Sequence, residues 1–262
     1  MLVKIESTSN GIFKNTKKLA THSGRKKSGL FVIEGLRSVK DAIKNGASVE
    51  YVVVCEGAEY TELFENQKVY MFSKKLFDEL KFTVNSQGVL AVVKSPENTV
   101  NNLINGCDFN KIKKAVYLDA VQDPGNLGTI VRTCDAMGVD ALILGEGCAD
   151  LYNPKVVRST MASIFNIPVY SDNSKEETFK KFNDAGFKIA GTFLSAEKYI
   201  YNTDLTGRCL IVMGNEANGI STEVESMCNL KVKIPMSGNA ESLNVATACA
   251  MILYEQYRQN NC

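Results

Sequence analysis

The sequence predicts an α/β protein made of two domains. From residue 111 onward, short apolar runs alternate with amphipathic stretches, a pattern that implies a parallel sheet flanked by helices. Residues 1–94 contain a second, smaller set of strands and helices. Between the two sets lie Pro96, several asparagines and Gly106, a composition that disfavours regular structure. We therefore predict domains at 1–94 and 111–262, joined by a linker at 95–110.

The bulk composition excludes several classes of protein. Among 262 residues, 45% are hydrophobic and 23% are charged, as in soluble globular proteins. No apolar run reaches the ~18 residues of a membrane helix, and the N-terminus lacks the apolar core of a secretory signal. The eight cysteines form no CxxC pair, and His22 is the single histidine. We expect no metal, no membrane and a reduced, cytoplasmic compartment.

The first domain begins with a one-signed basic run. No acidic residue lies between Glu6 and Glu34, and with a net charge of only +1 an RNA partner would need such local patches. The six positive residues are Lys14, Lys17, Lys18, Arg25, Lys26 and Lys27. A solvated surface and a phosphate-binding surface are both open interpretations. The pairs Ser23-Gly24 and Ser28-Gly29 favour a loop that could become ordered on RNA.

The remainder of the first domain is expected to alternate strands and helices. A helix with an apolar face should run from Gly35 to a C-cap at Asn45-Gly46, and Ser73 should begin a second helix. The apolar runs that predict strands are 30–33, 49–54, 68–72 and 89–93.

The second domain is expected to repeat strand–loop–helix units. Its predicted strands are 116–118, 141–144, 167–170, 188–191, 210–213 and 231–234. Its predicted helices are 127–137, 154–163, 175–184, a helix capped by Ser221, and one that opens at 241–244 and reaches Tyr257.

Three of these strands end in polar, glycine-containing loops. Residues 119–128 follow the first strand, Gly214 to Gly219 follow the fifth, and 237–244 follow the sixth. Open parallel sheets bind ligands at the carboxyl ends of their strands. The three loops are therefore the candidate binding site.

Together the three loops resemble the three motifs of the SpoU (TrmH-like) RNA ribose 2′-O-methyltransferases of the SPOUT superfamily. The resemblance covers residues ~115–257, as a series of strand–loop–helix units. The matching residues are Asn126, Gly128, Arg132, Gly214, Asn215, Glu216, Gly219, Ser242, Leu243 and Asn244. The sequence departs from the usual pattern at Ala217, where many members have glycine, and at Ala246, where many have serine. The first domain is more loosely similar to the L30e-like substrate-binding domain of many SpoU enzymes.

The resemblance implies a cofactor, a partner and a fold. It implies a deep trefoil knot in the second domain, a homodimer built through that domain, and S-adenosylmethionine held largely by backbone groups of the knot loops. Glycines such as Gly214, Gly219 and Gly238 would let the backbone approach the cofactor closely. The implied cofactor-binding residues are Met213, Gly214, Asn215, Gly219, Ile234, Met236 and Leu243. The implied catalytic residues are Arg132, Asn126, Glu216, Ser242 and Asn244.

Arg132 is the residue that the resemblance places at the reacting ribose hydroxyl. A guanidinium does not lose its proton in proteins, which argues against its acting as the base. We interpret Arg132 as the group that positions the phosphate and stabilises the forming alkoxide. Arg158, with Lys155, could face RNA, or could lie on a solvated helix face.

Three functions remain open on the sequence. The first is an RNA 2′-O-methyltransferase acting on ribosomal RNA or, alternatively, on tRNA; the extra first domain resembles those of ribosomal RNA enzymes, including antibiotic-resistance methyltransferases. The second is a non-catalytic RNA-binding or ribosome-assembly protein that keeps the fold, which the intact motif residues disfavour. The third is another nucleotide-binding enzyme, which the lack of phosphate-loop signatures disfavours.

Overall fold

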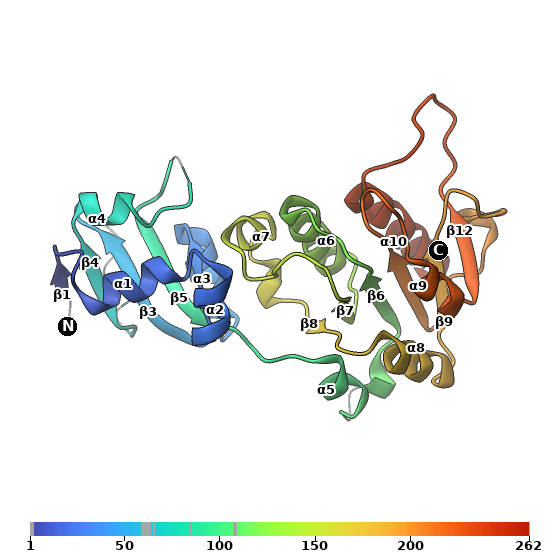
Figure 1. The fold of residues 1–262 in the computed structure, drawn as a ribbon, viewed down its shortest axis with the longest axis horizontal. Coiled ribbons are helices and arrows are strands. Elements are labelled where there is room, and N and C mark those ends of the chain that lie inside the picture. The colour runs from blue at the N-terminus through green and yellow to red at the C-terminus, as the bar shows by residue number, and fades with distance from the viewer. Residues whose placement is uncertain (1–2, 59–63, 65, 84, 107–108, 262) are drawn as a thin grey trace. The chain divides into compact units, whose positions relative to one another are not determined.

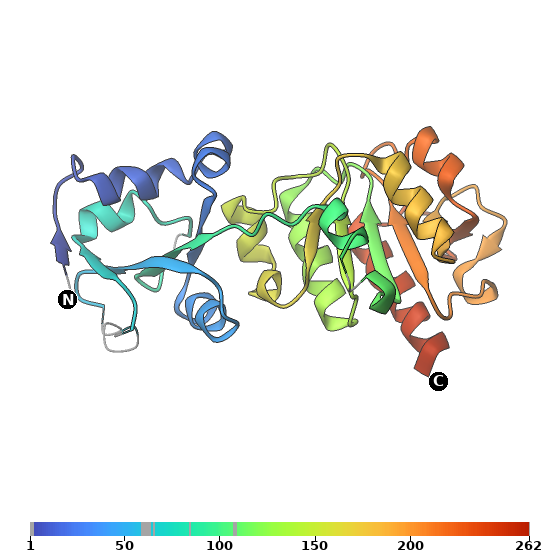
Figure 2. The same cartoon turned by 90° about the horizontal axis from the view of Figure 1, so that it is seen from below.

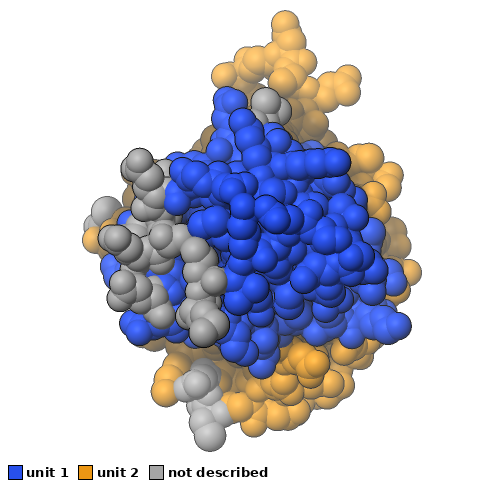
Figure 3. Space-filling model, turned by 90° about the vertical axis from the view of Figure 1, so that its left-hand side faces the viewer, with its two compact units in different colours: residues 1–96, 150–165 blue, residues 97–149, 166–262 orange. Residues whose placement is uncertain are grey.

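The chain folds into two compact units (Figures 1 and 3). The structure is a computed structural model that describes residues 3–58, 64, 66–83, 85–106 and 109–261. Unit 1 comprises residues 1–96 and 150–165, and unit 2 comprises residues 97–149 and 166–262. Among the described residues, no helix is both long and apolar enough to cross a membrane.

Unit 1 contains a mixed sheet with the strand order β1-β4-β3-β5-β2. The strands are β1 Val3–Ile5, β2 Leu30–Glu34, β3 Val49–Cys55, β4 Val69–Phe72 and β5 Val89–Lys94. Strands β1, β4 and β3 are parallel, whereas β5 runs antiparallel to both β3 and β2. The four predicted strands are confirmed. The sequence analysis missed β1, which is only three residues long and is defined by its pairing with β4.

Helices cover both faces of this sheet. They are α1 Gly11–Lys18, α2 His22–Ser28, α3 Leu36–Lys44, α4 Lys74–Asp78 and α7 Pro154–Ser159. On one face Phe13 and Leu19 pack with Leu76 and Phe77 of α4. On the other face, residues of α3 and of the segment 152–165 bury the alternate side chains of the strands.

The basic run does not form the predicted loop. It folds into α1 and α2, which begin at Asn10 and Thr21, whose side chains accept hydrogen bonds from the backbone amides of Ile12 and Gly24. At Gly24 a side chain would lie 2.0 Å from the Lys18 carbonyl oxygen, so this glycine is needed for close packing rather than for flexibility. Helix α2 is short and buries mainly Arg25, so it lacks the apolar periodicity that predicts a helix.

The segment 150–165 belongs to unit 1 by packing, although it lies within the predicted second domain. The rings of Tyr152 and Phe31 are 4.6 Å apart between centroids, and Val157 joins the same core. Helix α7 also ends at Ser159, four residues earlier than predicted. The reason is that Met161 and Ala162 adopt left-handed φ angles of 50° and 74°, after which η3 (Ser163–Phe165) forms.

Unit 2 contains a parallel seven-stranded sheet with the order β10-β12-β9-β11-β6-β7-β8. The strands are β6 Lys114–Leu118, β7 Ala141–Leu144, β8 Val169–Ser171, β9 Lys188–Thr192, β10 Lys198–Tyr199, β11 Cys209–Met213 and β12 Leu230–Lys233. The parallel α/β prediction is confirmed. The two-residue edge strand β10 was not predicted.

Two layers of helices enclose this sheet (Figures 1 and 2). Helices α6 and α10 pack together on one face, and the rings of Phe179 and Phe182 from α8 pack with Val224 of α9 on the other. The helices are α5 Val100–Ile104, η2 Phe109–Lys111, α6 Pro124–Ala136, α8 Lys175–Asp184, η4 Ile200–Asn202, α9 Thr222–Met227 and α10 Val245–Asn261.

The predicted linker is partly folded. Val100, Leu103 and Phe109 are buried in the core of unit 2, so α5 and η2 belong to that unit. Residues 107–108 of the predicted linker lie outside the described residues. The sequence did not predict this packing, because Val100, Leu103 and Phe109 are separated by polar residues, several of them asparagines, and form no regular apolar pattern.

Candidate active site

A cavity of about 770 Å³ lies at the carboxyl ends of β9, β11 and β12. The loops after these strands, the start of α10 and one residue of α6 form its walls. The predicted residues that line it are Asn126, Met213, Gly214, Asn215, Glu216, Gly219, Ile234, Met236, Ser242, Leu243 and Asn244. The structure therefore brings the three sequence motifs together around one cavity, as expected for an open α/β sheet.

Glycines allow the loop after β11 to close tightly. Asn215 and Gly219 exchange two backbone hydrogen bonds of 2.8 and 2.9 Å, and Gly219 has a left-handed φ of 70°. A Cβ atom on Gly214 would lie 2.2 Å from both the carbonyl carbon of Gly219 and the nitrogen of Ile220. Gly214 is thus required because the two ends of the loop touch. Gly238 does not line the cavity, and a side chain there would meet open space.

Asn215 supports the loop from inside. Its Nδ2 donates to the carbonyl oxygen of Ala120 at 2.8 Å, and its Oδ1 accepts from the amides of Ala217 and Asn218. Ala120 has a φ of 57°, which is unusual for a residue other than glycine. Asn215 therefore joins the loop after β6 to the loop after β11. Ala217 takes part in this turn through its backbone amide, which donates to Oδ1 of Asn215, so its methyl group does not prevent the turn.

Glu216 connects the first and second motifs. Its carboxylate accepts hydrogen bonds from the backbone amides of Gln122 and Asp123 and from Nδ2 of Asn126, at 3.0 to 3.1 Å. Burial alone would raise the pKa of Glu216, but these donors outweigh it and lower the pKa below its ordinary value of 4.5. Glu216 is therefore a charged acceptor near neutral pH, and it fixes the start of α6 beside the cavity.

Asn126 extends the same network to the third motif. Its Oδ1 accepts a hydrogen bond of 2.8 Å from Nδ2 of Asn244. Oδ1 of Asn244 in turn accepts from the amides of Ala246 and Thr247 at the start of α10. Asn244 thus caps the helix that the sequence analysis expected it to open. The two asparagines and Glu216 form one continuous polar chain through all three motifs.

Several cavity residues were not predicted. They are Thr192, Phe193, Leu194, Ser195, Ala217, Asn218, Val232, Lys233, Glu241, Val245 and Ala248. Thr192 ends β9, and Phe193, Leu194 and Ser195 begin the segment that follows it. The rule that ligands bind at the carboxyl ends of parallel strands could have found this segment, although it lacks the polar, glycine-containing pattern of the other loops. Ile234, Leu243 and Phe193 provide apolar wall, whereas Lys233 and Glu241 provide charges of opposite sign.

Arg132 does not line the cavity. It lies in the third turn of α6, and its side chain is exposed. Within the described part of the chain, it has no hydrogen-bond or ion-pair partner. An exposed, unpaired guanidinium on the helix that begins at the cavity is available to a ligand that approaches from outside the chain.

The predicted RNA-contacting residues divide into two groups. Arg158 and the lysines at 14, 17, 18, 26 and 27 are exposed in unit 1, although Lys17 also pairs with Glu79. Arg25 is only 6% exposed, and its guanidinium donates to Asp150 and to the carbonyl oxygen of Leu19. The prediction that Arg25 contacts RNA is corrected, because its donors are used inside the protein.

We expect Arg25→Ala to destabilise unit 1 by about 2 kcal/mol, because it leaves the largely buried Asp150 without its main partner. Burial raises the pKa of Asp150, but His22 and Arg25 outweigh it and lower that pKa. The stabilisation that Arg25 provides is therefore fully present above the unfolded aspartate pKa of about 3.9. It should fade as the pH falls through the lower pKa of Asp150 in the folded protein, so the two proteins should differ less at acid pH. Urea denaturation at pH 7 and pH 3 measures the effect. Lys26→Ala, which alters an exposed neighbour, should leave the midpoint unchanged. Equal midpoints for Arg25→Ala and wild type would contradict the structural role.

The lining of the cavity suits an organic ligand. Among the described residues, no group of three histidine, cysteine, aspartate or glutamate side chains is placed to hold a metal. The cavity combines apolar walls, backbone polar groups of a glycine-containing loop and a few charges, which is the usual lining of a cofactor site. A parallel α/β unit with such a cavity at its strand ends belongs to the class of folds that bind nucleotide-like cofactors, and the exposed lysines of the small α/β unit are of the kind that contact polyanions.

Comparison with known proteins makes the assignment specific: the chain belongs to the SpoU rRNA Methylase family, whose model matches residues 113–254. Residues 10–91 match the MRM3-like substrate binding domain. The 23S rRNA (guanosine(2553)-2′-O)-methyltransferase RlmP of Bacillus subtilis is 34% identical over 252 residues, which cover 96% of this chain and 98% of that protein.

Two solved structures have the same fold over nearly the whole chain. The AdoMet-bound rRNA methyltransferase from Sinorhizobium meliloti has a TM-score of 0.86 and 28% identity, covering 98% of both chains. The SpoU methyltransferase AviRb from Streptomyces viridochromogenes, in complex with AdoMet, has a TM-score of 0.83 and 28% identity, covering 95% of this chain and 98% of that one.

Proposed function

We propose that this protein transfers a methyl group from S-adenosylmethionine to a ribose 2′-hydroxyl of ribosomal RNA. The observation that carries the proposal is the polar chain Glu216–Asn126–Asn244, which ties all three motifs of the family around one cavity. Relatives along nearly the full chain are named as ribosomal RNA 2′-O-methyltransferases or contain AdoMet, which supports the same substrate and cofactor here.

The cavity residues fit S-adenosylmethionine. We propose that backbone groups between Gly214 and Gly219 hold its polar parts, and that Ile234, Met236 and Leu243 contact the adenine. Met213 and Asn215 complete the wall at the end of β11. Ser242, together with Glu241, lies where the loop turns into α10 and is placed to contact the ligand. When bound, the cofactor supplies a methyl group on a positively charged sulfonium.

The residues of the chain would act mainly by alignment and by electrostatics. Glu216 holds the first turn of α6 through Asn126, which fixes the helix that carries Arg132. Arg132 binds the phosphate next to the target ribose and stabilises the negative charge that develops on the 2′-oxygen. The hydroxyl proton leaves to water, since a guanidinium keeps its own protons. Placing the oxygen in line with the methyl group provides most of the acceleration.

We further propose that unit 1 holds the RNA through its exposed basic residues. Lys14, Lys18, Lys26 and Lys27 lie on two consecutive helices, and Arg158 is exposed on α7. Such contacts go to phosphates and give affinity without sequence information. They predict binding that weakens steeply as the salt concentration rises.

A second copy of the chain is proposed as a partner through α10. Val245, Cys249, Ile252 and Leu253 are buried in the core of unit 2, but Met251, Tyr254 and Tyr257 leave an exposed apolar stripe along the same helix. Such a stripe suits an isologous contact between two copies. We also propose the deep trefoil knot of the family for unit 2, and a cytoplasmic location, which the free cysteines of the described chain fit.

Methylation of unmodified RNA tests the proposal directly. Purified protein is incubated with tritiated S-adenosylmethionine and, separately, with 23S ribosomal RNA transcribed in vitro and with bulk tRNA. We expect label in ribosomal RNA at a position that resists alkaline cleavage, because 2′-O-methylation blocks attack by the hydroxyl. Label in tRNA alone would assign the other substrate. Absence of both label and cofactor binding by calorimetry would support the non-catalytic RNA-binding alternative instead.

A further inference from the structure

A stacked pair of tyrosines lies at the β10 edge of unit 2. The rings of Tyr199 and Tyr201 are 5.3 Å apart between centroids and are inclined by only 12°. The ammonium nitrogen of Lys233 lies 5.0 Å from the centroid of the Tyr199 ring. Tyr201 is 49% exposed, so much of its side chain is open to solvent. Neither tyrosine takes part in the network through the three motifs described above.

The strand register explains why lysines and aromatic rings share one face. In the parallel pair of β10 and β12, Tyr199 lies opposite Lys233, and paired residues project to the same side. Lys231 lies two residues before Lys233 and shares its face. Its nitrogen is 5.4 Å from the centroid of the Phe193 ring. This face, which we call the tyrosine–lysine surface, therefore consists of Phe193, Tyr199, Tyr201, Lys231 and Lys233.

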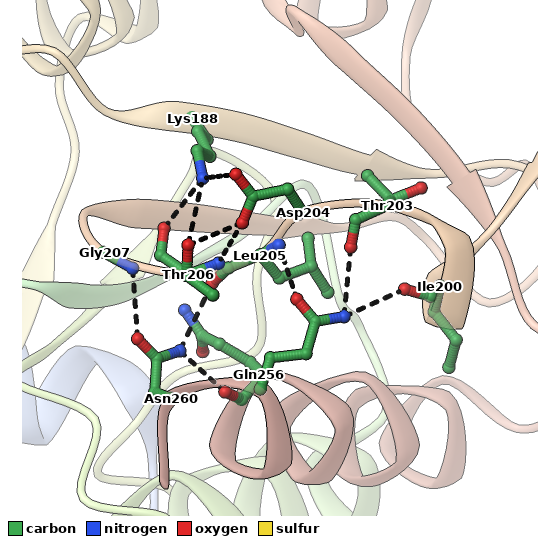
Figure 4. A network of polar contacts seen from close by, with 10 residues as sticks. Lys188, Ile200, Thr203, Asp204, Leu205, Thr206, Gly207, Gln256 and Asn260 are labelled. Carbon is green, nitrogen blue, oxygen red and sulfur yellow. Dashed lines mark hydrogen bonds and ion pairs between the residues drawn. The ribbon is translucent and has the colours of Figure 1, made fainter. Parts of the chain in front are cut away.

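The segment that carries the tyrosines is firmly anchored (Figure 4). The side chain of Gln259 in α10 donates to the carbonyl oxygens of Ile200 and Thr203 and accepts from the amide of Leu205. The side chain of Asn260 accepts from the amide of Gly207 and donates to the carbonyl oxygen of Leu205. Lys188 forms an ion pair with Asp204. Tyr201 is thus presented on a fixed backbone, which lowers the entropic cost of binding a ligand to its ring.

The tyrosine–lysine surface is continuous with the cofactor cavity. Phe193 and Lys233 belong both to this surface and to the cavity wall. A ligand on Tyr201 would therefore be a close neighbour of a ligand in the cavity. The surface also carries positive charge that suits an anionic ligand: Lys233 has no carboxylate partner among the described residues, while Lys231 is paired with Glu225.

We propose that the tyrosine–lysine surface binds an unpaired nucleotide of the RNA substrate that neighbours the methylated one. The base stacks on Tyr201, and the phosphate lies near Lys231 and Lys233. Single-stranded nucleic acid is recognised in this way by aromatic platforms beside basic side chains. The inference rests on the proposed function, because it names a further subsite for the RNA of that reaction.

Kinetics of Tyr201→Ala with 23S ribosomal RNA transcribed in vitro test the proposal. We expect the KM for RNA to rise about 10-fold, as loss of one base-stacking contact does. The kcat at saturating RNA and the Kd for S-adenosylmethionine should not change. Tyr201→Phe keeps the ring and loses the hydroxyl, so its KM should stay within about twofold of wild type if stacking alone matters. Lys181→Ala, at an exposed lysine on α8, is the matched control for Lys231→Ala, which should raise the KM.

A fluorescence measurement separates base stacking from a structural role. The chain has no tryptophan, so Tyr201→Trp introduces a unique one. Its emission should be quenched on addition of the same RNA, in proportion to binding. An unchanged KM in Tyr201→Ala, an equal loss in Tyr201→Phe, or the absence of quenching would each overturn the proposal. Those results leave the proposed function intact as long as wild type methylates the RNA, whereas failure of wild type to bind and methylate it would remove both.

Discussion

Replacing Arg132 by alanine is expected to lower kcat for RNA methylation by at least about 100-fold, the loss typical of removing one group that stabilises an oxyanion. The structure gives the reason. Arg132 is exposed on α6, lies outside the cavity wall, and has no partner among the described residues. Its donors are thus free for the RNA, and the cofactor site does not depend on it.

The affinity for S-adenosylmethionine is the measurement that tests this role. Calorimetry should give nearly the same Kd for Arg132→Ala and wild type. Arg132→Lys should recover only part of the rate, because an ammonium group retains the charge but not the two-pronged geometry of a guanidinium. Arg37→Ala, at a highly exposed arginine in unit 1, is the matched control and should leave kcat unchanged. A large loss of cofactor binding in Arg132→Ala would contradict the role of Arg132 at the RNA and would place it in the cofactor site.

Replacing Gly214 by alanine is expected to weaken cofactor binding by at least tenfold, or about 1.4 kcal/mol. The added methyl group would overlap the backbone of Gly219 and Ile220, at 2.2 Å from both atoms. Because those contacts are backbone rather than flexible side chain, the loop from Gly214 to Gly219 must open. Its carbonyl and amide groups would then no longer line the cavity in the arrangement that binds the cofactor.

Gly238→Ala provides the control for this variant. It is the same substitution in the third motif, but nothing lies within 4 Å of the added atom and the residue is exposed. Cofactor Kd by calorimetry and the thermal midpoint should both match wild type for Gly238→Ala. For Gly214→Ala, an unchanged Kd would show that the loop tolerates the overlap and that the backbone at this position does not shape the site.

The sequence predicts those features of the site that depend on the order of strands and loops along the chain. Each motif loop follows a buried strand, and parallel strands place their carboxyl ends at one edge of a sheet. Asn126, Glu216 and Asn244 could thus be assigned to one site before their hydrogen bonds were seen. Strand and helix boundaries were predicted best where the apolar pattern is regular, as for α8 at 175–184.

The features that the sequence did not reveal depend on partners far away in the chain. Arg25 is of a residue type that binds phosphate and lies in a basic run. Its guanidinium nevertheless bonds to Asp150, 125 positions later, and is buried in unit 1. The segment 150–165 lies between strands of unit 2 in sequence but completes the core of unit 1, because Tyr152 and Val157 find their apolar contacts there. Charge and periodicity are properties of neighbours in sequence, so neither one indicates these pairings.

The sequence by itself determined the alternating α/β fold and the positions of the three motif loops, because local propensity and strand order specify them. The family followed from the resemblance of the residues in those loops to known motifs. Only the tertiary structure decided which basic residues are exposed, that the end of β9 and the segment after it add Thr192 to Ser195 to the cavity wall, and that Tyr199 lies against both Tyr201 and Lys233. The physical reason is that burial, hydrogen-bond partners and aromatic stacking arise between segments that only folding brings into contact.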